Sequence, residues 1–211
     1  FWGHPVGRRY RNLAMTKPGY DHGLEEKRLC EHAITDTQPV WKLAGVGSVG
    51  GQVMTGLPVV RALRSDKRLR ERCRIWPFET GLSPMTARDT AKTPIVLAEI
   101  YPSLVTPVSA RPAVKDALQV QAIAAHMAAA DDERKLGRMF AGSPDLTAKQ
   151  RRTIEREEAW ILGVDRPGTR AGSIRVDVDA AYGAAGFAYL NDGAAIYAES
   201  RRIIESETDL T

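Results

Sequence analysis

Two acidic residues, Glu99 and Asp116, have the type and position that metal-dependent hydrolysis requires. Glu99 ends an apolar run bounded by Pro94 and Pro102, the pattern of a buried strand, and Asp116 comes near the start of the next helical segment. Loops and helix N-termini converge at the carboxyl ends of strands in α/β sheets, so both acids are expected at a ligand-binding edge. Two carboxylates at one place repel each other unless a cation lies between them, which predicts Mg²⁺ or Mn²⁺. Such an ion can polarise a phosphodiester and activate water.

The helical position of Asp116 supports this expectation. Val120, Ile123 and Met127 follow it at offsets of four, seven and eleven residues, so the acid is predicted on the inward face of the helix. A structural alternative stays open, in which Asp116 stabilises the start of its helix and Glu99 pairs with a nearby Arg or Lys.

Glu79 is a further acid that follows a predicted strand, here the segment at residues 73–78. It is a candidate third metal ligand or substrate contact. A surface turn is the alternative interpretation of the same segment.

A basic segment at residues 61–74 suggests an anionic partner. It has seven cations and only two acids, Asp66 and Glu71, and it accounts for much of the net charge of +4. A basic stripe is typical of proteins that bind polyanions, so Arg61, Arg64 and Arg68 are candidate phosphate ligands of a nucleic acid. A solvated helix face is the alternative. The cations of the segment are Arg61, Arg64, Lys67, Arg68, Arg70, Arg72 and Arg74, and Lys115, beside the second acid, is a further candidate phosphate ligand.

The glycine-rich segment at residues 45–50 matches the G-x-G-x-x-G pattern after a predicted strand at residues 40–44. Dinucleotide binding needs a helix that opens inside the motif, and we expect Gly56 and Pro58 to break such a helix within two turns. A tight turn or a loop that contacts phosphate through Gly47 and Ser48 is therefore the preferred interpretation.

These residues are expected on alternating strands and helices. Strands are predicted at residues 73–78 and 93–100, and helices at residues 59–72, 114–130 and 147–160. Thr147 and Gln150 form a capping-box pattern, and Gly163 is placed to stop the last helix. The alternation predicts an α/β fold with a mixed sheet flanked by helices.

The bulk composition excludes several classes of protein. The chain has 211 residues, 43% of them hydrophobic and 27% charged, which is enough to bury a core. We find no apolar stretch long enough for a bilayer and no secretory start, so we expect a cytoplasmic protein without a membrane partner. Cys30 and Cys73 are too few for a disulfide framework, which favours reduced thiols.

Several blocks together resemble the bacterial domain of unknown function 429. The similarity covers about residues 38–164, and it implies a ribonuclease-H-like fold, suspected nuclease activity, and Glu99 and Asp116 as two of the metal-binding acids. Such folds place their first acid on an opening strand that has no counterpart before Val40, so we expect weak metal binding. The blocks are Leu43-Ala-Gly-Val-Gly47-Ser-Val-Gly50, Thr55-Gly-Leu-Pro58, Ile75-Trp-Pro-Phe-Glu79, Ala98-Glu-Ile-Tyr-Pro102-Ser103, Val114-Lys-Asp116 and Arg156-Glu-Glu-Ala-Trp160-Ile-Leu-Gly163.

A second resemblance covers about residues 188–211. The run from Tyr189 to Leu210 is similar to the opening helix of precorrin-8X methylmutase, a cobalamin-pathway isomerase whose catalytic histidine comes later than this chain extends. The resemblance implies a fused or misread frame and an association with cobalamin-pathway enzymes, without that activity. The chain begins at Phe1 and ends without a helix stop, which favours a fragment of a longer reading frame.

Three functions and a domain plan follow from the sequence. The first function is a divalent-metal phosphodiesterase that acts on nucleic acid, the second a non-catalytic accessory module linked to cobalamin synthesis, and the third a dinucleotide-binding protein. We expect the C-terminal portion of a ribonuclease-H-like domain at residues 1–164, a linker at 165–187, and a methylmutase-like segment at 188–211. The sequence predicts no oligomeric state.

Overall fold

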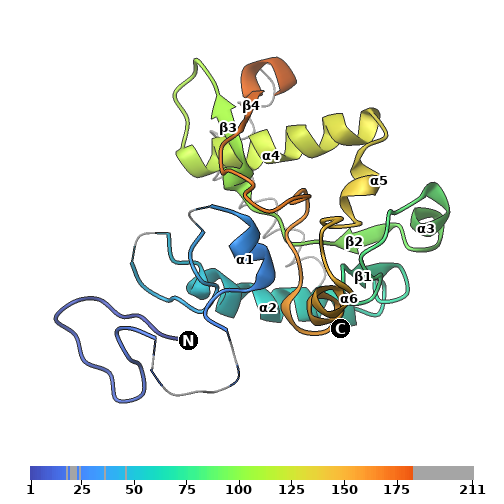
Figure 1. Cartoon of the computed structure of the whole chain (residues 1–211). Helices are drawn as coiled ribbons and strands as arrows, with labels where there is room; N and C mark the ends of the chain where they lie inside the picture. Colours follow the sequence, from blue (N-terminus) through green and yellow to red (C-terminus); the bar gives the residue numbers. More distant parts are fainter. Residues whose placement is uncertain (18, 20–22, 24, 36, 46, 183–211) are drawn as a thin grey trace, which may run out of the picture. The chain divides into compact units, whose positions relative to one another are not determined.

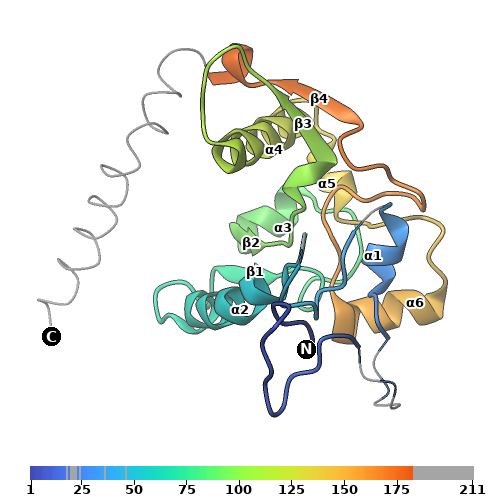
Figure 2. The ribbon, with the colours of Figure 1, turned by 90° about the vertical axis from the view of Figure 1, so that its left-hand side faces the viewer.

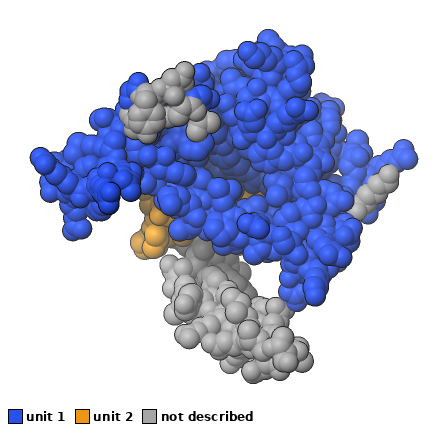
Figure 3. All heavy atoms as spheres, turned by 90° about the horizontal axis from the view of Figure 1, so that it is seen from below, with its two compact units in different colours: residues 1–101, 133–171 blue, residues 102–132, 172–211 orange. Residues whose placement is uncertain are grey.

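A computed structural model describes residues 1–17, 19, 23, 25–35, 37–45 and 47–182 of the chain. It is a mixed α/β structure, which confirms the predicted class. The chain divides into two compact units, one of residues 1–101 and 133–171 and the other of residues 102–132 and 172–211 (Figure 3). Among the described residues, none of the helices combines the length and the apolar composition needed to cross a bilayer.

The first unit is built on a parallel pair of short strands. Cys73 pairs with Ile95 and Ile75 with Leu97, and the Trp76 N–H extends the pair by donating to the Leu97 carbonyl at 2.9 Å. The elements of this unit are α1 (Leu29–Ala33), α2 (Gly50–Ser65), β1 (Cys73–Ile75), α3 (Ala87–Lys92), β2 (Ile95–Leu97), α5 (Leu136–Met139), α6 (Ala148–Thr153) and the π-helical turn η2 (Ile154–Glu158) (Figure 1).

Capping residues fix two of these helices. The Thr86 N–H and hydroxyl both donate to the Asp89 carboxylate, at 2.9 and 2.6 Å, which starts α3. At α6 the Gln150 N–H donates to the Thr147 hydroxyl while the Gln150 side chain accepts from the Thr147 N–H. This reciprocal pattern satisfies backbone donors that have no partner inside the helix, and the predicted capping box is confirmed.

Two tryptophans form the centre of the first unit's core. Trp76 is 1% exposed, meets the Phe140 ring edge-to-face at 5.6 Å, and donates its indole N–H to the Phe140 carbonyl. Trp160 is also 1% exposed and donates to the Val164 carbonyl at 2.8 Å. Each large ring is thus buried with its polar atom paired, which removes the usual cost of burying an indole.

The start of α2 was predicted wrongly. The helix begins at Gly50 and continues through Gly56 and Pro58, whereas we expected a break there and a helix from residue 59. The Gly50 N–H donates to the Lys42 carbonyl at 2.9 Å, so a tertiary contact fixes the first turn where local propensity is weak. The strand predicted at residues 40–44 is also wrong: this segment is turn-like, with an isolated bridge from Lys42 to Trp2.

The second unit has its own parallel pair and one long helix. It contains the short 3-10 helix η1 (Pro102–Leu104), β3 (Val105–Val108), α4 (Lys115–Asp132) and β4 (Ile174–Asp177). Val105 pairs with Ile174 and Val108 with Asp177. The helix α4 contacts both strands, as Figures 1 and 2 show. Val105, Ala122, Ile123 and Val178 form the buried core of this unit.

The sheet differs from the expected one. Within the described residues the strands form two separate two-stranded parallel sheets, not one mixed sheet. Part of the segment expected as a linker, residues 174–177, forms β4. The side chains of β2 are only partly buried, so the prediction of a buried strand is wrong. Among the strands that the structure describes, β2 pairs only with β1.

Candidate functional site

Glu99 lies just after β2, as predicted, but its carboxylate is held by an arginine. Arg28 donates from Nη1 to Glu99 Oε2 at 2.8 Å and from Nη2 to Glu99 Oε1 at 2.7 Å. Arg28 also donates to the Glu31 carboxylate at 3.0 Å and to the Glu158 carbonyl at 3.0 Å. The alternative prediction, that Glu99 pairs with an Arg or Lys, is confirmed.

Arg28 is nearly buried, with 11% of its side chain exposed. Burial disfavours the guanidinium charge, but the hydrogen bond to Glu99 and the negative charges around it outweigh burial and raise the pKa of Arg28 above its ordinary value. Arg28 therefore carries a permanent charge, and this charge neutralises Glu99. In the structure Glu99 is therefore one partner of an ion pair, and its role as a metal ligand stays a prediction.

Asp116 is in the first turn of α4, as predicted, but it is exposed. Val114, just before the helix, is 72% exposed and Val120 is 56% exposed, whereas Ile123 is 1% exposed. The prediction that Asp116 lies on the inward face is therefore wrong, because Val120, one turn further along the same face, is exposed as well. Glu99 belongs to the first unit and Asp116 to the second, so their shared metal site stays a prediction. In the described part of the chain, no three His, Cys, Asp or Glu side chains are grouped as metal ligands.

Glu79 forms an ion pair with Arg64 beside β1. Arg64 donates from Nε to Glu79 Oε2 at 2.8 Å and from Nη2 to Glu79 Oε1 at 2.6 Å. The Glu79 carboxylate also accepts the Ile75 N–H at 2.8 Å. The hydrogen bond from Arg64, assisted by the Ile75 N–H and the charges of Arg64 and Arg74, lowers the pKa of Glu79. Its role as a metal ligand stays a prediction.

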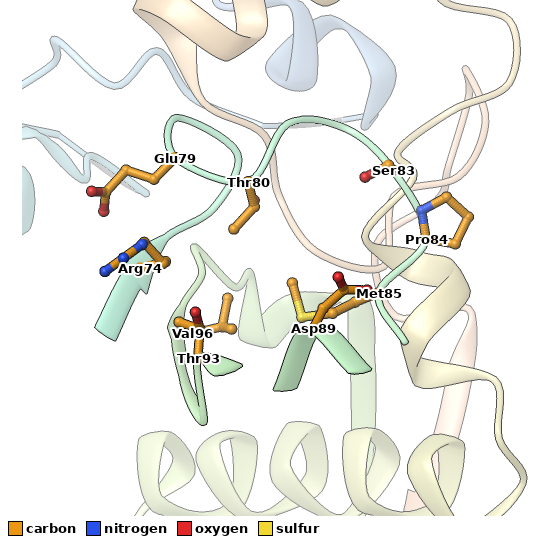
Figure 4. A pocket seen from close by; sticks show the side chains of 9 residues that line it. All are labelled: Arg74, Glu79, Thr80, Ser83, Pro84, Met85, Asp89, Thr93 and Val96. Atoms are coloured by element: carbon orange, nitrogen blue, oxygen red, sulfur yellow. The ribbon is translucent and has the colours of Figure 1, made fainter. Parts of the chain in front are cut away.

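A pocket of about 230 Å³ lies next to this ion pair in the first unit. Arg74 comes from β1, Val96 from β2 and Asp89 from α3, while the loop after β1 supplies Thr80 and Ser83. Figure 4 shows the charged ends of Arg74 and Glu79 on one side and Ser83 on the other. The full lining is Arg74, Glu79, Thr80, Ser83, Pro84, Met85, Asp89, Thr93 and Val96.

Sequence reasoning missed most of this pocket. Arg74 and Glu79 were singled out for their charge, but Thr80, Ser83 and Thr93 carry no motif. Their position in the connection between two parallel strands is the one signal that could have pointed to them, because such connections collect ligands.

The basic segment at residues 61–74 is only partly neutralised. Arg64 pairs with Glu79, Arg68 with Asp66 at 3.3 Å, and Arg70 with Glu71 at 3.3 Å. The other four cations have no carboxylate within ion-pair distance among the residues that the structure describes: Arg61, Lys67, Arg72 and Arg74.

Arg64 and Arg74 are oriented by one backbone atom. Nη1 of each donates to the Arg70 carbonyl, at 2.9 Å from Arg64 and 3.1 Å from Arg74. Arg74 also donates to the Cys73 carbonyl at 2.8 Å. Among the described residues, the hydrogen bonds of its guanidinium therefore go to backbone carbonyls and not to a carboxylate.

The glycine-rich loop before α2 is a tight turn. The Ser48 hydroxyl and N–H both donate to the Gly45 carbonyl, at 2.7 and 3.2 Å, and Gly47 has a φ of 72°. The turn that we preferred is confirmed, and the phosphate contact of Gly47 and Ser48 stays a prediction. Lys115 is the exposed first residue of α4 in the second unit.

The segment that resembles precorrin-8X methylmutase, residues 188–211, lies outside the described residues. Comparisons of the chain with protein-family models, with curated proteins and with solved structures found no match. Both family resemblances therefore stay predictions.

Proposed function

We propose that the chain binds nucleic acid through the basic segment at residues 61–74. The observation that carries this proposal is the set of four cations without a carboxylate partner among the described residues, Arg61, Lys67, Arg72 and Arg74. Cations that are already paired inside the protein gain little from a phosphate, whereas unpaired ones release counterions from the polyanion when they bind.

Exposed cations in this segment are expected to make the binding of nucleic acid depend on charge and not on the shape of the partner. Arg61, Lys67 and Arg72 are exposed side chains, and the segment combines the end of α2 with the turn that leads to β1. Exposed cations on one stretch of chain follow a phosphate backbone without reading sequence. Affinity is therefore expected to fall steeply with salt.

A triple substitution with a matched control tests the proposal. Arg61→Gln, Lys67→Gln and Arg72→Gln together remove three charges from the segment, and Lys149→Gln, Arg152→Gln and Arg156→Gln remove three exposed charges from α6 and η2. Binding of a fluorescent single-stranded oligonucleotide would be measured over a series of salt concentrations. For single strands, loss of three phosphate contacts lowers the slope of log K against log salt by about 2.

The control triple variant is expected to keep the slope of the unchanged protein. If both triple variants weaken binding equally, the contact is a general effect of net charge and the assignment to residues 61–74 is wrong. Absence of salt-dependent binding by the unchanged protein would overturn the proposal altogether.

Metal-dependent cleavage and a ribonuclease-H-like fold stay predictions from the sequence. Cleavage would need Glu99 to break its ion pair with Arg28 or to share its oxygens with a metal ion. Breaking that ion pair costs free energy, and a carboxylate without an arginine partner would not have this cost. Magnesium-dependent hydrolysis that disappears in Glu99→Gln would support it. Binding alone does not require it.

A further inference from the structure

The pocket between β1 and α3 combines polar groups of both kinds with an apolar surface. Hydroxyl groups come from Thr80, Ser83 and Thr93, and apolar atoms from Met85 and Val96. Its volume of about 230 Å³ is below the range of roughly 300–1,000 Å³ that is typical for pockets that enclose a drug-sized ligand. It therefore fits one small group of a larger molecule.

The charges of the pocket do not favour a phosphate group. Glu79 lines it together with Arg74, and the Arg64 side chain balances Glu79 through their ion pair. Asp89 adds a further carboxylate to the lining. Positive charge at the pocket is thus matched by negative charge, whereas three of the cations without carboxylate partners, Arg61, Lys67 and Arg72, lie along the chain before it.

We propose that this pocket holds a single unpaired nucleobase of the nucleic acid whose phosphates bind to residues 61–74, an inference that rests on the proposed function. A nucleobase is uncharged, has donors and acceptors along its edge, and has two flat apolar faces. The hydroxyl and charged groups of the pocket can form hydrogen bonds with the edge of the base, and Val96 and Met85 can contact its faces. Proteins that bind single strands commonly combine a basic track with places that hold individual bases, usually aromatic side chains, and here the lining of the pocket would hold the base instead.

Arg74 connects the two parts of the proposed site. It is the last cation of the basic segment and also lines the pocket, and the carbonyl of Arg70 fixes its guanidinium beside Arg64. A base that enters the pocket would therefore have its own phosphate close to Arg74. The pocket is accessible only to a base that is not paired, so single strands are expected to bind better than duplexes.

The experiment compares a single-stranded oligonucleotide with an abasic strand of the same length at one salt concentration. Both strands have the same phosphates, so only the base-containing strand can use the pocket. It is expected to bind about tenfold more tightly, which is the size of effect expected from one or two hydrogen bonds to the edge of the base. In Ser83→Trp the new ring enters the pocket from its exposed rim, and the difference between the strands is expected to vanish while abasic binding is unchanged.

Ala148→Trp is the matched control, because it adds the same ring at an exposed position of α6 in the same unit. It is expected to keep the preference for the base-containing strand. Thr80→Tyr blocks the pocket from another side and replaces Ser83→Trp if that variant loses its folded circular dichroism spectrum. Equal binding of the two strands by the unchanged protein would overturn the pocket assignment and leave the phosphate contact standing.

Failure of the proposed function gives a different result. If neither strand binds, the pocket is tested with the four uncharged ribonucleosides in a thermal-shift or NMR titration. Saturable binding that disappears in Ser83→Trp but not in Ala148→Trp would support a nucleobase pocket without a polyanion contact. Lack of nucleoside binding in that case would overturn both proposals.

Discussion

Arg28 and Glu99 form a two-point ion pair in the first unit, with N···O distances of 2.8 and 2.7 Å. The pair joins Arg28, which lies just before α1, to Glu99, which lies just after β2. From a third segment, the Leu162 N–H donates to the Glu99 carbonyl. Arg28 contacts Glu31 as well, whose side chain is only 3% exposed. One guanidinium thus forms ion pairs with a buried and with a partly exposed carboxylate.

Replacing Arg28 is expected to destabilise the protein strongly. Arg28→Met leaves the buried Glu31 carboxylate without a counter-charge, and removal of one partner of a buried ion pair costs about 3–5 kcal/mol. Glu99→Gln keeps an acceptor for Arg28 and affects a partly exposed side chain, so it is expected to cost about 1 kcal/mol. Urea denaturation of both variants measures the difference. Equal costs would mean that Glu31 finds another partner.

The sequence singled out Glu99 but could not predict that Arg28 is the basic residue that binds it. The helices predicted at residues 114–130 and 147–160, from alanine content and the Thr147 capping box, correspond to α4 and to α6 with η2, because these signals are local. The contact between Arg28 and Glu99 joins residues 71 positions apart, and its register depends on how α1 packs against the chain after β2. No local pattern specifies such a contact.

The pocket was missed for a related reason. Arg74 and Val96 are neighbours only because Arg74 pairs with Val96 in the parallel register of β1 and β2. Thr80 and Ser83 then lie near them because the connection from β1 returns through α3. The sequence predicts that β1 and β2 exist, but each strand has only three residues. Such short strands do not specify the register that brings the side chains of their connection together.

The Arg64–Glu79 ion pair predicts a dependence of stability on pH. The folded-state pKa of Glu79 is lowered from an ordinary value of 4.5, chiefly by the hydrogen bond from Arg64. The stabilisation is therefore fully present above about pH 4.5 and is lost as the pH falls through the lower folded-state pKa. The stability difference between the unchanged protein and Glu79→Gln, measured by urea denaturation, is expected to shrink below pH 4.5.

Arg64→Gln provides the control for this prediction. In that background Glu79 has lost the donor that lowers its pKa, so Glu79→Gln is expected to have a smaller effect with little dependence on pH. A Glu79 effect that keeps its full pH dependence without Arg64 would assign the shift to the Ile75 N–H instead.

Burial along α4 predicts effects of very different size for two substitutions on one helix. Ile123 is 1% exposed in the core of the second unit, so Ile123→Ala is expected to cost about 2–5 kcal/mol. Val120 is 56% exposed, and Val120→Ala is expected to change stability by less than about 0.5 kcal/mol. Thermal unfolding followed by circular dichroism compares them. A large cost at Val120 would contradict the exposed position of this face and of Asp116.

Adjacent glycines at the start of α2 are expected to respond in opposite directions to alanine. A Cβ on Gly50 would lie 2.7 Å from the Lys42 carbonyl oxygen, a backbone atom that cannot rotate away. Gly50→Ala is therefore expected to cost about 1–3 kcal/mol. A Cβ on Gly51 meets nothing within 4 Å, and Gly51→Ala should stabilise the helix by about 0.5–1 kcal/mol.

Urea denaturation of the two alanine variants measures this contrast, and helix propensity alone cannot produce it because both substitutions are glycine to alanine. Gly50 also donates its N–H to the Lys42 carbonyl at 2.9 Å, so displacement of that carbonyl would weaken the contact that starts α2. Stabilisation by both alanines would show that the first turn of α2 does not approach Lys42 in solution. The helix would then begin later, nearer to the start that local propensity favours.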